Sequence, residues 1–171
     1  MKFSFRRPQP SDYELLHTWL NSPHVKEWWT GDTSLNAVKT DFNEKLAGDT
    51  VYPYIVELDG KPIGYIQRYD ANKAGEGWWP DEPEGTWGID QFIGVETLLD
   101  QGIGAALIRE FTAKMFKGGE ATRIIADPRP DNARAIRAYE KAGFRAVKEI
   151  TTPDGKALLM ELLKKPEGRN T

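Results

Sequence analysis

The stretch from Gly88 to Ile108 constrains this chain most, because an apolar strand pattern runs through a short turn into a helix that opens with Gly-x-Gly. Gly102 and Gly104 have no Cβ, so a ligand could approach the backbone closely at this turn. The first N–H groups of a helix, at the positive end of its dipole, form an anion site. Two interpretations follow: a loop that binds a pyrophosphate, or a glycine-rich connection without a ligand, since short glycine motifs often occur by chance.

The hydrophobic pattern of the whole chain predicts an α+β fold. Helical spacing covers residues 12–20, 35–46, 103–116 and 132–142, with Ser34 as a cap of the second helix. Strand patterns cover residues 2–7, 52–58, 63–68, 123–127, 144–150 and 158–162, besides the strand that begins at Gly88. Most of these strands follow one another as hairpins around one β-α-β unit. We therefore expect a mixed, mostly antiparallel twisted sheet flanked by helices.

Length and composition limit the classes of protein. The chain has 171 residues, which suits a single domain over residues 1–171, and residues 164–171 read as a polar tail. It has no cysteine, which excludes disulfides, thiolate catalysis and cysteine-bound zinc. Its two histidines, His17 and His24, both lie near the start, so we expect no metal site and no hydrolase triad. No apolar run approaches the ~18 residues of a membrane span, and the first residues lack the apolar core of a signal peptide. We expect no membrane partner and a cytoplasmic location.

The net charge is −3, and the charges are unevenly distributed along the chain. No Lys or Arg occurs between Lys73 and Arg109, whereas this span holds seven carboxylates. A nucleic-acid surface would have the opposite sign. Because Trp78, Trp79 and Trp87 lie within the same span, a cleft for a cationic organic ligand is one interpretation, and an ordinary solvated loop is the other.

A second motif indicates a family. The run Asn132-Ala-Arg-Ala-Ile-Arg-Ala-Tyr-Glu-Lys-Ala-Gly-Phe closely resembles the second acyl-CoA motif of the GNAT superfamily of N-acetyltransferases. The run Gln101-Gly-Ile-Gly-Ala lies where that superfamily has its pyrophosphate loop, although Leu99 occupies the usual Gln or Arg position. The resemblance implies the GNAT fold and acetyl-CoA as cofactor. The implied loop contacts are Gln101, Gly102, Ile103, Gly104 and Ala105.

A closer resemblance covers almost the whole chain. Several polar or aromatic pieces are similar to those of the aminoglycoside 6′-N-acetyltransferases, among them His24-Val-Lys-Glu-Trp-Trp, Gly77-Trp-Trp, Gly88-Ile-Asp-Gln and Thr151-Thr-Pro-Asp-Gly. A member of this family transfers the acetyl group of acetyl-CoA to the 6′-amine of an aminoglycoside and gives antibiotic resistance. Without cysteine, we expect direct attack of the amine in a ternary complex. The acidic span fits a polycationic substrate.

The resemblance also implies roles for individual residues. Asp90 corresponds to the catalytic aspartate, and burial on an apolar strand would raise its pKa, which favours a general base. The alternative is an acceptor that only orients the ammonium group. Tyr139 corresponds to the tyrosine that can protonate the leaving thiolate, although its spacing also fits a packed aromatic. Asn132 and backbone groups of Phe92, Ile93 and Val95 would bind the pantetheine arm.

The implied substrate contacts are side chains scattered over the chain. Glu76 stands where relatives carry Asp, and Asp154 also suits an ordinary Pro-Asp-Gly turn. The full set is Trp29, Gln67, Glu76, Trp79, Asp90, Asp127 and Asp154.

Two other functions remain open from the sequence. One is a siderophore-type acetyltransferase that acylates a hydroxylamine such as N-hydroxylysine, in which we would expect a histidine at position 90. The other is a non-catalytic acyl-CoA sensor, which would not need both Asp90 and Tyr139. We expect a monomer or a weak dimer.

Overall fold

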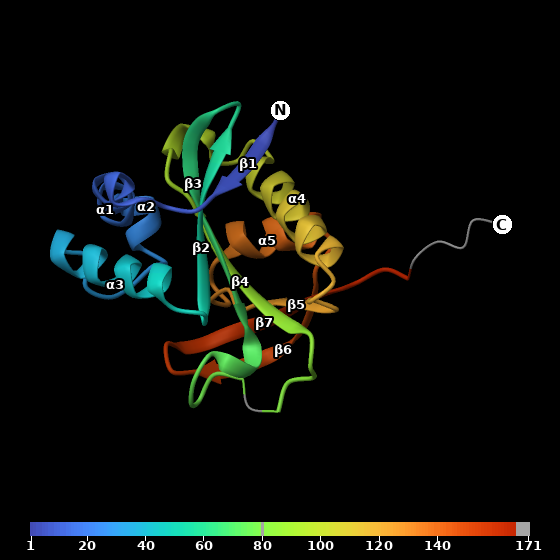
Figure 1. Ribbon diagram of the computed structural model, residues 1–171. Helices are drawn as coiled ribbons and strands as arrows, with labels where there is room; N and C mark the ends of the chain where they lie inside the picture. Colours follow the sequence, from blue (N-terminus) through green and yellow to red (C-terminus); the bar gives the residue numbers. More distant parts are fainter. Residues whose placement is uncertain (80, 167–171) are drawn as a thin grey trace.

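A computed structural model of the chain describes residues 1–79 and 81–166, so the last part of the expected polar tail, residues 167–171, lies outside the described residues. Seven strands form one sheet in the order β1-β2-β3-β4-β5-β7-β6 (Figure 1). All neighbouring strands are antiparallel except β4 and β5, so the prediction of a mixed, mostly antiparallel sheet is confirmed. The strands are β1 (Phe3–Arg6), β2 (Val51–Leu58), β3 (Lys61–Asp70), β4 (Thr86–Ile93), β5 (Arg123–Ala126), β6 (Arg145–Thr152) and β7 (Gly155–Leu163).

Helices cover both faces of the sheet (Figure 1). One side carries α1 (Tyr13–Leu20), α2 (Pro23–Lys26) and α3 (Leu35–Ala47), and the other carries α4 (Ile103–Lys117) and α5 (Ala133–Lys141). Three short 3-10 turns, η1 (Pro10–Asp12), η2 (Ala71–Lys73) and η3 (Glu96–Leu98), lie in the connections. None of the helices in the described part of the chain is long and apolar enough to cross a membrane.

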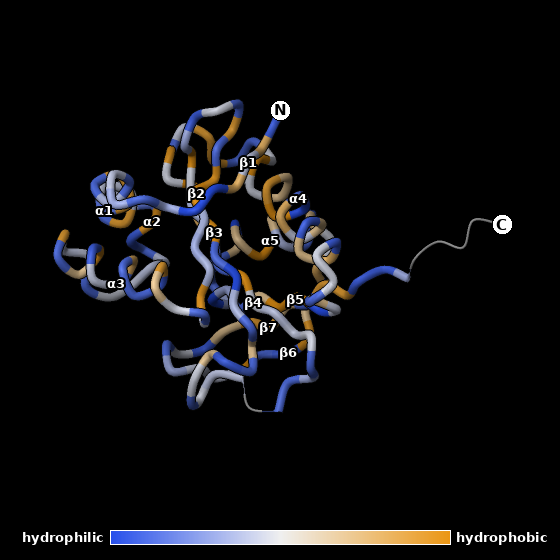
Figure 2. Tube along the Cα trace, viewed as in Figure 1, coloured by the Kyte–Doolittle hydropathy of each residue, from blue (hydrophilic) through white to orange (hydrophobic). Residues whose placement is uncertain are grey.

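The sheet has a hydrophobic core on each face, because side chains alternate along a strand. Tyr65 and Phe92 pack with the residues of α1, α2 and α3, whereas their neighbours Ile66 and Ile93 pack with α4 and α5. On α4 the expected inward residues Ile103, Leu107, Ile108 and Phe111 are buried, and Met115 is partly buried. Figure 2 shows hydrophobic segments along α4 and a hydrophilic stretch leading to the C-terminus.

Local sequence signals account for several boundaries. The side-chain oxygen of Ser34 accepts a hydrogen bond from the Ala37 N–H at 3.2 Å, so its predicted role as the cap of α3 is confirmed. The turn between β2 and β3 places Asp59 and Gly60 at φ of 50° and 82°, as a tight hairpin requires. Strands β3 and β7 are longer than predicted, because cross-strand partners extend both ladders into polar residues.

The two parallel strands diverge, and this opens the sheet. Pairing between β4 and β5 joins Thr86–Gly88 to Arg123–Ile125 and then stops. Strand β4 continues to Ile93, paired only with β3, while β5 ends at Ala126. Beyond Gly88, β4 therefore has an open edge next to the loop that leads into α5.

Candidate active site

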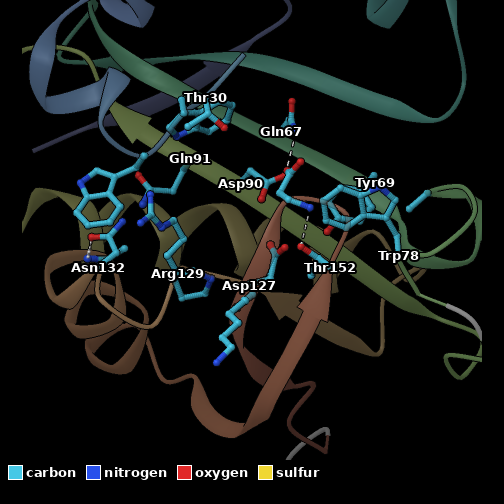
Figure 3. Close-up of a pocket in the computed structure, with 18 of the residues that line it drawn as sticks. Thr30, Gln67, Tyr69, Trp78, Asp90, Gln91, Asp127, Arg129, Asn132 and Thr152 are labelled. Atoms are coloured by element: carbon cyan, nitrogen blue, oxygen red, sulfur yellow. Dashed lines mark hydrogen bonds between the residues drawn. The ribbon is translucent and has the colours of Figure 1, made fainter.

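A cleft of about 760 Å³ lies at this divergence. Its walls come from the segment after α2, from β3 and β4, from the loop between β5 and α5, and from the β6–β7 hairpin (Figure 3). Most of the side chains that the sequence assigned to catalysis or to substrate line it, namely Trp29, Gln67, Trp79, Asp90, Asp127, Tyr139 and Asp154. Asn132, which was assigned to the cofactor, lines it as well. The tertiary structure thus brings together residues that are far apart in the chain.

Asp90 is held by a short hydrogen-bonded chain across β3 and β4. Gln67 is the cross-strand partner of Asp90, and its Nε2 donates to Asp90 Oδ2 at 2.9 Å (Figure 3). The Tyr65 hydroxyl donates to Gln67 Oε1 at 2.6 Å. Because the amide oxygen accepts from Tyr65, the amide nitrogen is directed at Asp90.

Asp127 lies next to Asp90, and the two carboxylates influence each other. Burial raises the pKa of Asp90, and the hydrogen bond from Gln67 partly offsets this. Burial, followed by the negative charge of Asp90, raises the pKa of Asp127 well above its usual value. The pair therefore holds a proton more readily than two separate carboxylates would.

Tyr139 projects from α5 into the same cleft. Its ring is 5% exposed and packs edge-on against Phe144 at 5.2 Å between centroids. Burial, and then the charges of Asp90 and Asp127, raise the pKa of the Tyr139 hydroxyl far above its usual value. The hydroxyl consequently keeps its proton at neutral pH and is a donor. Tyr139 is thus a packed aromatic, as one alternative predicted, and its position in the cleft is also compatible with the predicted catalytic role.

Aromatic side chains form much of the remaining wall. Trp29 packs edge-on against Phe92 and Tyr65, with centroids at 5.1 and 5.9 Å. Trp79 is 6% exposed, and its Nε1 donates to the Tyr69 hydroxyl at 3.2 Å. The ring of Trp28 faces the Arg129 guanidinium at 5.1 Å. Aromatic faces and carboxylates in one cleft suit a cationic ligand.

The glycine turn after β4 has the geometry expected of an anion site. Gly102 caps α4 with φ of 78°, a left-handed conformation that favours glycine. A Cβ at Gly102 would meet no atom within 4 Å, and a Cβ at Gly104 would meet ordinary contacts at 3.7 Å, on Ala138 and Ile93. The first intrahelical bond of the turn runs from Ala106 N to the Gly102 carbonyl, and the preceding N–H groups at the start of α4 can face a phosphate. These residues fit the pyrophosphate of coenzyme A.

Two of the predicted cofactor side chains are already engaged within the chain. Gln101 is exposed, and its Nε2 donates to the Thr97 carbonyl at 2.6 Å. Asn132 caps α5, because its Oδ1 accepts from the Ala135 N–H at 3.2 Å. Only the amide nitrogen of Asn132 is left to contact a ligand in the cleft. Helix capping is thus a structural role for this asparagine.

The predicted backbone contacts on β4 divide between its two edges. Gly94 N donates to the Ile63 carbonyl at 2.8 Å, so by the alternation of an antiparallel ladder Phe92 also bonds toward β3. Ile93 faces the open edge, as predicted for a backbone contact. Val95 N donates to the same Ile63 carbonyl at 3.3 Å and is therefore engaged.

The residues that line the cleft differ from the predicted substrate contacts: one predicted residue is missing, and others were not predicted. Glu76 is exposed in the loop before Trp78 and is not among the residues that line the cleft. Gln91, Arg129 and Lys156 line the cleft but were not predicted. The alternation of β4 could have indicated Gln91. No local signal distinguishes Arg129 or Lys156 from ordinary surface cations.

Comparisons with known proteins agree with this geometry. Residues 9–152 match the family model described as an acetyltransferase (GNAT) domain. The aminoglycoside N(6′)-acetyltransferase type 1 of Klebsiella pneumoniae is 43% identical over 155 residues, which are 87% of this chain and 77% of the relative. A solved structure of AAC(6′)-Ib with paromomycin and acetyl-CoA has a TM-score of 0.90 and 40% identity, and the match covers 96% of this chain and 94% of that one.

A second solved structure shows AAC(6′)-Ib with coenzyme A and kanamycin, with a TM-score of 0.89 and 40% identity over 95% of each chain. The family model spans most of the chain, and the relatives match the fold over nearly all of it. The chain belongs to the GNAT acetyltransferase family.

Proposed function

We propose that this protein transfers the acetyl group of acetyl-CoA to the 6′-amine of aminoglycoside antibiotics by direct attack in a ternary complex, and so gives resistance to them. The observation that carries the proposal is the position of Asp90. Its carboxylate is held by Gln67 in a cleft with an acidic and aromatic wall, and the open edge of β4 leads from it to the glycine start of α4.

The donor side would hold acetyl-CoA mainly through the backbone. The N–H groups at the start of α4 face the pyrophosphate, and the open edge of β4 at Gln91 and Ile93 pairs with the amides of the pantetheine arm. The amide nitrogen of Asn132 is placed to donate to the same arm. Acetyl-CoA supplies an activated acyl group and a thiolate leaving group.

The acceptor side would bind the antibiotic through side chains. Aminoglycosides carry several ammonium groups, and the carboxylates of Asp90, Asp127 and Asp154 complement them. The rings of Trp29 and Trp79 offer flat surfaces for the sugar rings and their cations. Arg129 and Lys156 lie on the same cleft and limit where an ammonium group is accommodated.

Asp90 and Tyr139, whose pKa values are both raised, would carry out the proton transfers. An amine near neutral pH is mostly protonated and must lose a proton before it attacks. Asp90 accepts that proton, either directly or through water, because its carboxylate lines the cleft beside the other acidic groups that would hold the amine. Tyr139 donates its hydroxyl proton to the departing sulfur, and the second proton of the acetylated nitrogen then passes back to the phenolate, which restores the hydroxyl. Because the chain has no cysteine, no thiol acyl-enzyme can form.

A panel of acceptors tests the proposal. Release of coenzyme A is measured with aminoglycosides that carry or lack a free 6′-amine, and with N-hydroxylysine as the siderophore-type acceptor. Turnover only with the 6′-amine compounds supports the proposal. Turnover with N-hydroxylysine alone supports the siderophore reading, and coenzyme A binding without turnover of any acceptor supports a sensor. Sedimentation of the same preparation would check the expected monomer or weak dimer.

A further inference from the structure

One hydrogen bond at the open edge of β4 joins the two sides of the cleft. The ladder geometry decides which groups reach this edge. Gly94 N donates to the Ile63 carbonyl at 2.8 Å on the β3 side, and Thr122 N donates to the Gly85 carbonyl at 2.9 Å on the β5 side. Because bonding alternates along a strand, the backbone groups of Gln91 and Ile93 face away from β3, toward the edge that β5 leaves open.

His24 contacts this edge from a distant part of the chain. Its Nε2 lies 2.9 Å from the Ile93 carbonyl oxygen, a contact between residues 69 positions apart. A carbonyl oxygen only accepts, so Nε2 carries the hydrogen and donates. The imidazole ring also occupies the space directly in front of that oxygen. The Ile93 carbonyl is therefore the one group on this edge that the chain itself covers, among the residues the structure describes.

The same histidine belongs to the segment that carries two tryptophans of the cleft. His24 is the second residue of α2, whose Val25 is 2% exposed and anchors the helix in the core. Trp28 and Trp29 follow directly and line the cleft. The bond to Ile93 thus ties the wall of the acceptor side to the strand of the donor side.

We propose that His24 is a positioning residue that fixes the register in which the pantetheine arm of the donor pairs with β4. This inference rests on the proposed function. An extended arm pairs with the free groups of the edge, which are both groups of Gln91 and the N–H of Ile93. A shift of the arm toward the end of β4 would place one of its N–H groups against the carbonyl that His24 covers. Register along a strand edge is otherwise weakly specified, and a shifted arm moves the thioester away from Asp90 and Tyr139.

The test compares two donors that differ in how they are held. With acetyl-CoA, the start of α4 still binds the nucleotide end and limits the shift. With S-acetylpantetheine, which lacks the nucleotide, only the strand edge sets the register. We expect His24→Phe, which keeps a ring and removes the donor, to lower kcat/KM by about tenfold with S-acetylpantetheine and about threefold with acetyl-CoA. His24→Gln retains an N–H donor and should recover most of the loss.

The other histidine of the chain provides the matched control. His17 lies on α1, is also partly buried, and has no side-chain hydrogen bond to the described residues. His17→Phe should leave kcat/KM unchanged with both donors. The dissociation constants of pantetheine and coenzyme A, measured by calorimetry for the same variants, give a second readout that does not depend on turnover. We expect His24→Phe to weaken the binding of pantetheine more than the binding of coenzyme A.

The outcomes separate this inference from the proposed function. An equal loss with both donors, or a lowered melting temperature that accounts for the loss, would show that His24 only supports the fold and would overturn the inference. Unchanged kinetics and binding in His24→Phe would overturn it as well. If the unmodified protein acetylates no aminoglycoside, the proposed function fails, and the calorimetric comparison still decides the role of His24.

Discussion

In the function that we propose, the two sides of the cleft recognise their ligands by different means. The acceptor side consists of side chains, with Asp90, Asp127 and Asp154 among aromatic rings. The donor side consists mainly of backbone, with the glycine start of α4 and the open edge of β4. Side-chain recognition depends on charge and can change with one substitution, whereas backbone recognition depends on conformation and on the space that small residues leave. A substitution on one side should therefore leave binding on the other side nearly unchanged.

The largest effect is expected at Asp90. Replacement by Asn keeps the size of the side chain and removes the proton acceptor, so kcat should fall by about 10²–10⁴-fold. Binding of acetyl-CoA, measured by calorimetry, should change by less than about threefold, because the donor side is intact. Activity equal to that of the unmodified protein would rule Asp90 out as the base.

A change of size at Gly104 should affect only the donor side. A Cβ there would meet ordinary contacts at 3.7 Å, so Gly104→Ala should fold and gain about 0.5–1 kcal/mol of stability in the helix. The two further methyl groups of Gly104→Val would cover the first N–H groups of α4 and weaken coenzyme A binding by about tenfold or more. Normal coenzyme A affinity in Gly104→Val, with its fold intact by circular dichroism, would contradict the proposed site.

Salt should distinguish the charged acceptor side. The KM for kanamycin should rise several-fold between low salt and about 0.5 M, because exposed charge pairs are screened. Asp154 is exposed at the rim of the cleft, and Asp154→Asn should flatten this dependence. Glu149→Gln removes an exposed carboxylate of β6, in the same hairpin but outside the cleft lining, and is the matched control. A KM that does not respond to salt would argue against recognition by carboxylates.

The paired carboxylates should lower stability at higher pH. Because the folded protein raises the pKa of Asp127, the folded state binds that proton more tightly than the unfolded chain does, and stability is lost as the pH rises above the usual carboxyl pKa of about 4. The asparagine side chain of Asp127→Asn cannot ionise, so this variant should have a melting temperature a few degrees above that of the unmodified protein at pH 8. The difference between the two melting temperatures should vanish near pH 4. A variant that is equally destabilised at both pH values would indicate lost packing rather than relieved charge.

The smallest effect is expected away from both sides. Ser34→Ala removes the cap of α3 and should lower the free energy of unfolding by about 1 kcal/mol, as measured by chemical denaturation. Both KM values and kcat should remain unchanged. A change in either KM would mean that the cleft responds to general stability, and the assignment of effects to separate sides would need revision.

The amino-acid sequence by itself determined the fold class, the glycine turn and the motif around Asn132 and Tyr139. These depend on local patterns: alternation on strands, helical spacing, and the conformational freedom of glycine at a helix start. The motif Gly88-Ile-Asp-Gln also allowed Asp90 to be predicted as the catalytic base. Such signals lie within a few residues of one another, so a single chain displays them without any tertiary contact.

The tertiary structure decided which groups are free to meet a ligand. Only the divergence of β4 from β5 shows that Ile93 faces the open edge while Phe92 is paired with β3. The same holds for Glu76, which lies outside the cleft lining, and for the bond from His24 to Ile93 across 69 positions. Proximity across a sheet depends on pairing and register between distant segments, and local sequence does not encode either one.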